Sequence, residues 1–214
     1  RGSRKDAATR ALDERRSSSE IASMRRPLLI RLPGDTDRSC LGGVPEGVDG
    51  AEWNLGCFKS SEASAIPGEI RSRVRALALD CPSVLVEESS RAVIGALELA
   101  ATLQVSVLNI AIPSVGGAES AGFDRYQDAL NFTHSLVRET RLEAEARGVV
   151  LAVVAPANGC FHSPVELREL LDAAHSSAVG VCVEIQAVSR FGSIEDWLTT
   201  LGSRVRSIRV SRPF

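Results

Sequence analysis

Residues 149–175 read VVLAVVAPANGCFHSPVELRELLDAAH, a short apolar run followed by a polar loop and an amphipathic segment. The run Val149–Ala155 has the length and composition of a buried β-strand. After the loop, Ser163 is suited to cap a helix, Pro164 fits the first helical position, and Glu166 can bond back to the cap amide. The segment therefore predicts one strand–loop–helix unit, with its helix over Pro164–His175.

The same unit recurs on both sides of this segment. The periodicity predicts further strands and helices, namely strands at Val74–Leu79, Val105–Ile112, Val179–Ile185 and Val205–Val210, and helices at about Glu87–Leu103, Asp124–Arg147 and Ile194–Leu201. Arg147-Gly148 is typical of a helix end, and Ser193 repeats the cap pattern of Ser163. Regular alternation of this kind predicts parallel strands joined by helical crossovers.

The N-terminal third is less regular. Pro27–Leu32 and Val48–Trp53 are predicted as the first two strands, but the segment between them shows no helical period. The total is seven strands, whereas a (β/α)₈ barrel has eight and about 250 residues. We therefore expect an α/β, TIM-barrel-like array that is an incomplete (β/α)₈ barrel. The edge of its seventh strand would be open, or be covered by a missing segment or a partner.

Composition sets the broad class of the 214-residue chain. Its net charge of −2 and pI of about 6.0 give no reason to expect nucleic-acid binding, and no apolar run approaches a membrane span. The five cysteines are widely spaced without a CxxC pair, which argues against zinc or a disulfide framework and favours a cytoplasmic setting. Cys182, inside an apolar strand, is expected to be a small buried hydrophobe.

The first residues differ in charge from the rest of the chain. Residues 1–26 contain eight Arg or Lys and four Asp or Glu, a net charge of +4. We predict a disordered basic extension over 1–26 and one barrel domain over 27–214. Met24 is the chain's only methionine and directly precedes the first strand, so we expect it to be the natural start.

Candidate site residues lie at or just after the carboxyl ends of the predicted strands, where ligands bind in such folds. We predict catalytic roles for Glu184 and His162, and substrate-binding roles for a further set: Glu52, Trp53, Asn109, Asn158 and Arg209. Each has a structural alternative. Glu184 and Arg209 can be ion-pairing residues, Trp53 can pack in the core, and His162 can be a solvated loop residue.

Several segments resemble the xylose-isomerase-like TIM barrels, the superfamily of sugar-phosphate isomerases and epimerases and of endonuclease-IV-type enzymes. They are Val48–Glu52, Ala96–Ile112, Gly148–Val153, Asn158–Pro164, Gly180–Glu184 and Ser193–Val210. The resemblance covers about Val48 to Val210. It implies metal-assisted isomerisation or epimerisation of a sugar or related hydroxy-carbonyl compound. It also implies a divalent ion (Mn, Mg or Zn) that polarises the substrate.

The family's metal ligands are mostly replaced in this chain. By resemblance, the glutamate that closes strand five corresponds to Val154, and the aspartate that closes strand six to Glu184. The histidine three residues later corresponds to Ala187, and the strand-seven histidine to Arg209. We therefore assign no metal ligand and expect an Arg209–Glu184 ion pair in the vacated site.

The residues thus favour a degenerate sugar isomerase or epimerase, a pseudoenzyme with weak or no activity that binds a small carbohydrate. The alternative is a non-catalytic structural protein that uses an open barrel edge, which would also allow a homo-oligomer. Endonuclease-like action on abasic DNA is disfavoured by the acidic core and the missing histidines. Neither a nucleic acid nor a membrane is expected as a partner.

Overall fold

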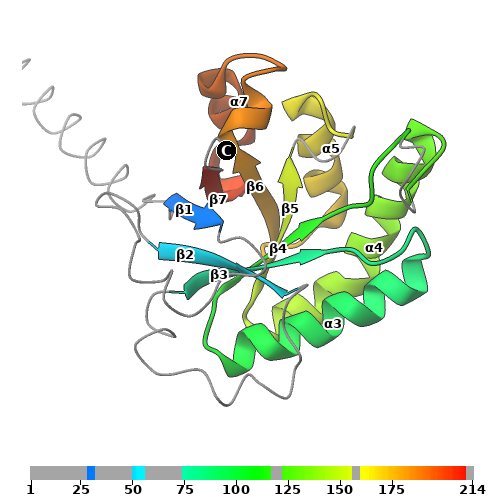
Figure 1. Cartoon of the computed structure of the whole chain (residues 1–214), viewed down its shortest axis with the longest axis vertical. Coiled ribbons are helices and arrows are strands. Elements are labelled where there is room, and N and C mark those ends of the chain that lie inside the picture. The colour runs from blue at the N-terminus through cyan, green and yellow to red at the C-terminus, as the bar shows by residue number, and fades with distance from the viewer. Residues whose placement is uncertain (1–27, 32–49, 56–73, 117–121, 156–159, 211–214) are drawn as a thin grey trace, which may run out of the picture.

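Seven parallel strands form a closed barrel in the computed structural model, which describes residues 28–31, 50–55, 74–116, 122–155 and 160–210. The strands, in chain order, are β1 (Leu28–Arg31), β2 (Gly50–Asn54), β3 (Val74–Asp80), β4 (Val107–Ala111), β5 (Val150–Ala155), β6 (Val179–Glu184) and β7 (Val205–Val210). Each pairs in parallel with the next. The α/β TIM-barrel-like array predicted from the sequence is confirmed (Figure 1).

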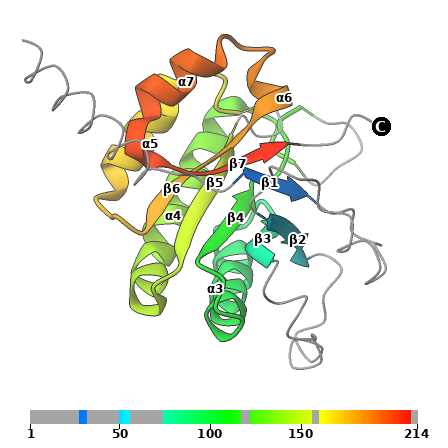
Figure 2. The same cartoon turned by 90° about the vertical axis from the view of Figure 1, so that its left-hand side faces the viewer.

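The barrel is closed by pairing between β1 and β7. Leu28 lies opposite Ile208 and Leu29 opposite Arg209, so the first and last strands lie side by side (Figure 2). The expectation of an open edge on the seventh strand is therefore wrong. The physical reason is that an open edge leaves a row of backbone N–H and C=O groups unpaired, and curling the sheet until β1 meets β7 satisfies them among the described strands.

The helices cover the outside of the β3–β7 part of the barrel (Figure 1). They are α3 (Val86–Thr102), α4 (Tyr126–Arg147), α5 (Pro164–Ala174), the short α6 (Ile185–Val188) and α7 (Ile194–Leu201), followed by the 3₁₀ turn η4 (Gly202–Arg204). The predicted cap residues are confirmed, since Ser163 accepts a hydrogen bond from the Val165 amide and Ser193 from the Glu195 amide. Gly148 ends α4 with a left-handed φ of 63°, a conformation that costs glycine little.

Successive side chains along a strand belong alternately to two apolar clusters. In β4 and β5, Leu108, Ile110, Leu151 and Val153 belong to the main core between sheet and helices. Their neighbours Val107, Ala152 and Val154 form a second cluster with Ala76 and Cys182. Because successive strand residues point to opposite faces, this second cluster fills the inside of the barrel.

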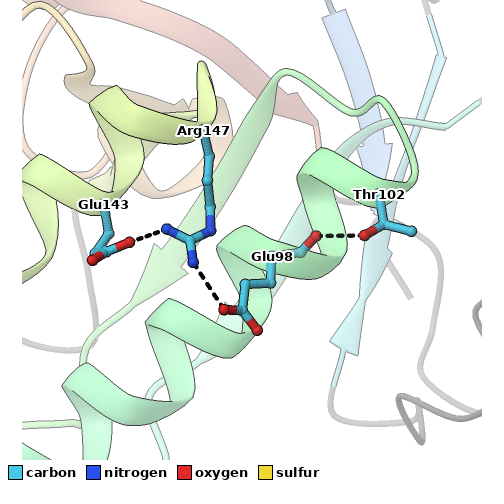
Figure 3. A network of polar contacts seen from close by, with 4 residues as sticks. All are labelled: Glu98, Thr102, Glu143 and Arg147. Atoms are coloured by element: carbon cyan, nitrogen blue, oxygen red, sulfur yellow. Dashed lines mark hydrogen bonds and ion pairs between the residues drawn. The ribbon is translucent and has the colours of Figure 1, made fainter.

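An arginine joins the two longest helices at the surface (Figure 3). The Arg147 guanidinium lies 2.8 Å from a Glu98 carboxylate oxygen on α3 and also contacts Glu143 on its own helix. Such exposed pairs contribute only about 0–1 kcal/mol each. The buried faces of α3 and α4 therefore dominate the stability of this pair. Among the described helices, none is both long and apolar enough to cross a membrane.

Some expectations concern residues outside the described part of the chain. These are the basic extension 1–26 with Met24, and the side chain of Trp53. They stay predictions.

Gly180 on β6 leads to a stability prediction. A Cβ at this position would lie 2.3 Å from Arg206 Cγ and 2.8 Å from the backbone carbonyl oxygen of Arg204. The G180A substitution should therefore lower the free energy of unfolding by about 1–3 kcal/mol through overpacking. Urea unfolding followed by circular dichroism measures this change.

Gly95 supplies the matched control for G180A. It lies on the exposed face of α3, and a Cβ there meets nothing within 4 Å. The G95A substitution should stabilise the protein by up to about 1 kcal/mol, because alanine is the better helix former. Equal effects at the two positions would contradict the close approach at Gly180.

Candidate functional site

A network of four polar side chains lies inside the barrel, among the apolar residues of the second cluster. Glu52 on β2, Asn109 on β4 and Ser207 on β7 have no exposed surface, and Arg209 on β7 is 2% exposed. Buried polar groups are costly unless they are hydrogen-bonded, so four of them in one place imply a connected arrangement.

The centre of the network is a two-point ion pair between Arg209 and Glu52. Arg209 Nε donates to Glu52 Oε2 at 3.1 Å, and Arg209 Nη2 lies 2.6 Å from Glu52 Oε1. This Oε1 atom makes no hydrogen bond of good geometry within the described residues. The charge of Glu52 therefore depends on the nearby guanidinium for its compensation.

Asn109 and Ser207 complete the network around the carboxylate. Asn109 Nδ2 donates to Glu52 Oε2 at 2.6 Å, and Ser207 Oγ donates to Asn109 Oδ1 at 2.9 Å. The hydroxyl thus fixes the amide so that its NH₂ group faces the carboxylate. Three strands, β2, β4 and β7, are joined through these side chains.

Glu184 lies at the outer end of this network. It is the last residue of β6, pairs in register with Arg209, and has a side chain 24% exposed. Its Oε2 atom lies 3.9 Å from Arg209 Nη1, at the limit of an ion pair. The expected Arg209–Glu184 pair therefore exists only as a long contact. Glu52 is the closer partner because it is fully buried and faces the guanidinium at two points.

The electrostatics of the site follow from burial. Burial works to lower the pKa of Arg209, but the attraction of Glu52, with contributions from Cys182 and Glu184, raises it above its ordinary value. Burial raises the pKa of the Cys182 thiol to about 12. Arg209 is thus a permanent cation. Cys182 is an unreactive, fully buried residue, as the sequence predicted.

An aromatic group is formed by His162 in the loop after β5, Phe191 after α6 and Tyr126 at the start of α4. The rings of His162 and Phe191 stack with centroids 4.3 Å apart and planes 8° apart, and Tyr126 lies 6.2 Å from His162. Tyr126 donates to Glu166 Oε2 at 2.8 Å, so this carboxylate, expected to reach the helix cap, binds the phenol. His162 is exposed, whereas the side chains of Glu52 and Arg209 are buried.

The structure brings together four of the residues singled out from the sequence: Glu52, Asn109, Glu184 and Arg209. His162 lies apart from them in the aromatic group, Asn158 is outside the described residues, and of Trp53 only the backbone in β2 is described. Sequence reasoning missed Ser207. Its signal is that Ser207 and Arg209 occupy alternate positions of β7 and therefore share one face of the strand.

The residues present do not fit the divalent ion that the resemblance implies. Such an ion needs several converging oxygen or nitrogen ligands. Val154 belongs instead to the apolar cluster inside the barrel, and the Arg209 guanidinium lies between two carboxylates. Within the described residues, no group of three or more His, Cys, Asp or Glu side chains could hold a metal.

Comparison with known proteins confirms the fold. No protein-family model and no curated protein matches the chain. A D-psicose 3-epimerase from Clostridium cellulolyticum H10, solved with D-tagatose, matches with a TM-score of 0.69 and 14% identity, over 88% of this chain and 85% of the epimerase. The E. coli 3-keto-D-glucoside 4-epimerase YcjR matches with a TM-score of 0.70 and 10% identity, over 88% and 80%. A xylose isomerase domain protein from Planctomyces limnophilus matches with a TM-score of 0.56 and 12% identity, over 85% and 70%.

Proposed function

We propose that this chain, whose fold is that of the xylose-isomerase-like TIM barrels, is a carbohydrate-binding protein that does not carry out metal-dependent epimerisation. The observation that supports this is the Arg209–Glu52 ion pair, which lies inside the barrel where the described residues offer no group of three metal ligands. A permanent cation there repels a divalent ion and takes up the nearest carboxylate.

Carbohydrate binding is proposed on two grounds. The similar barrels include proteins described as sugar epimerases. In this chain, Glu184 is a half-buried carboxylate at a strand end, and carboxylate oxygens accept hydrogen bonds from sugar hydroxyls. By contrast, Glu52 and Asn109 have no exposed surface. Glu184 is therefore the proposed sugar contact, with His162 and its stacked partner Phe191 as an outer aromatic wall.

We do not favour the alternative of a structural protein that pairs through an open strand edge. Within the described strands, β7 is bonded to β6 on one side and to β1 on the other. An association of two copies through that edge would require one of these pairings to open.

Two measurements on the purified protein test the proposed function. Elemental analysis should find no stoichiometric Mn, Zn or Mg, and incubation with D-psicose or D-tagatose plus Mn²⁺ should give no epimer by chromatography. Titration with the same two sugars and with D-fructose, followed by NMR, should show weak saturable binding. Turnover that depends on added metal would contradict the non-catalytic part. The absence of any saturable shift would contradict the binding part.

Matched variants locate the proposed contact. E184Q keeps the shape of Glu184 and removes its charge, so the Kd for the bound sugar should rise about tenfold, the effect of losing roughly one charge-assisted hydrogen bond. E195Q, on the exposed first turn of α7, should leave the Kd unchanged. If E184Q binds the sugar as tightly as the parent protein does, the sugar does not contact Glu184.

A further inference from the structure

The Glu52 carboxylate has an unusual position for a charged group. It is completely buried, inside a barrel that is otherwise filled mostly by small or apolar residues. A second carboxylate, that of Glu184, lies on the other side of the Arg209 guanidinium. Two carboxylates on either side of one point concentrate negative charge there, and a cation between them would neutralise it.

We propose that the inside of the barrel is a cation site formed by Glu52 and Glu184, and that the side chain of Arg209 is its resident cation. The guanidinium occupies the position between the two carboxylates, 2.6 Å from one and 3.9 Å from the other. It thereby links β2, β6 and β7, the task that a bound ion would otherwise perform. Sugar binding is not required for this role of Arg209, so the test below and the sugar titration can fail independently.

The geometry indicates that the positive charge of Arg209 matters here, and that its side chain does more than fill the volume between the strands. Arg209 approaches both oxygens of one carboxylate, since Nε donates a hydrogen bond to Glu52 Oε2 and Nη2 lies at ion-pair distance from Glu52 Oε1. β1 lies between β2 and β7 and pairs with both. The ion pair therefore spans the seam where the first strands of the chain close on the last.

Removal of the side chain should leave a site that accepts a free cation. In R209G, guanidinium chloride at low millimolar concentration, far below the molar range in which it unfolds proteins, should raise the Tm by at least about 3 °C relative to equal NaCl. MnCl₂ is the second probe, because oxygen ligands also suit a divalent ion. The unmodified protein should respond to neither, since its site is filled.

Two further variants make the test specific. R206G removes another β7 arginine, whose guanidinium donates to the Ser177 carbonyl, so neither cation should raise its Tm. R209K and R209M are similar in length and differ in charge, and R209K should have the higher Tm. The proposal is overturned if neither cation raises the Tm of R209G more than that of R206G. Should R209G not fold, a Tm of R209M equal to that of R209K overturns it.

Discussion

Replacement of Arg209 by methionine should lower the free energy of unfolding by about 3–5 kcal/mol, the cost of breaking a buried ion pair from one side. Methionine fills much of the same volume, so little of this loss comes from a cavity. The loss comes from Glu52, which has no exposed surface and would keep a charge without its compensating partner. Urea unfolding of R209M and the parent protein measures the difference.

A double-mutant cycle separates the pair from its surroundings. E52Q/R209M removes both charges together, and it should recover most of the stability that R209M loses. R147A, which breaks an ion pair on the surface of α3 and α4, should cost no more than about 1 kcal/mol. If E52Q/R209M is less stable than R209M, the buried charge of Glu52 is not the cause of the loss.

Replacement of Trp197 by alanine should cost about 3–5 kcal/mol, the usual effect of deleting a buried tryptophan. Trp197 is 1% exposed and is the largest of the fully buried side chains in the described part of the chain. Its helix, α7, is eight residues long and buries only this residue and Leu201. The helix is too short to be stable alone and packs mainly on α5, so we expect the tryptophan to supply most of what holds it there.

Circular dichroism is the suitable probe for W197A, because fluorescence would change with the loss of one of the chain's two tryptophans. W197F keeps an aromatic ring and should lose less than half as much stability. L198A, at the half-buried neighbouring position, should cost clearly less than W197A. Comparable losses for L198A and W197A would show that α7 is held by some other contact.

The candidate site could be predicted in part. Glu52, Asn109, Glu184 and Arg209 are predictable as site candidates because they lie at or near the carboxyl ends of predicted strands, where ligands bind in such folds. Glu184 is expected as the partner of Arg209 because the resemblance places both residues at positions of family metal ligands. The structure keeps that pair as a long contact of 3.9 Å, whereas Glu52 is the closer partner at 2.6 Å. Glu52 lies on β2, which pairs with β1 and β3 and not with β7.

The amino-acid sequence by itself determined the local elements of this protein. The repeat of apolar runs and amphipathic segments placed β3–β7, and Ser163, Ser193 and Gly148 marked helix boundaries, because these signals act between residues close in the chain. Only the tertiary structure decided that the barrel closes with seven strands and that Arg209 binds Glu52, 157 positions away. Both depend on how the twisted sheet curls, which brings β1 and β2 to β7 through geometry that no local pattern encodes.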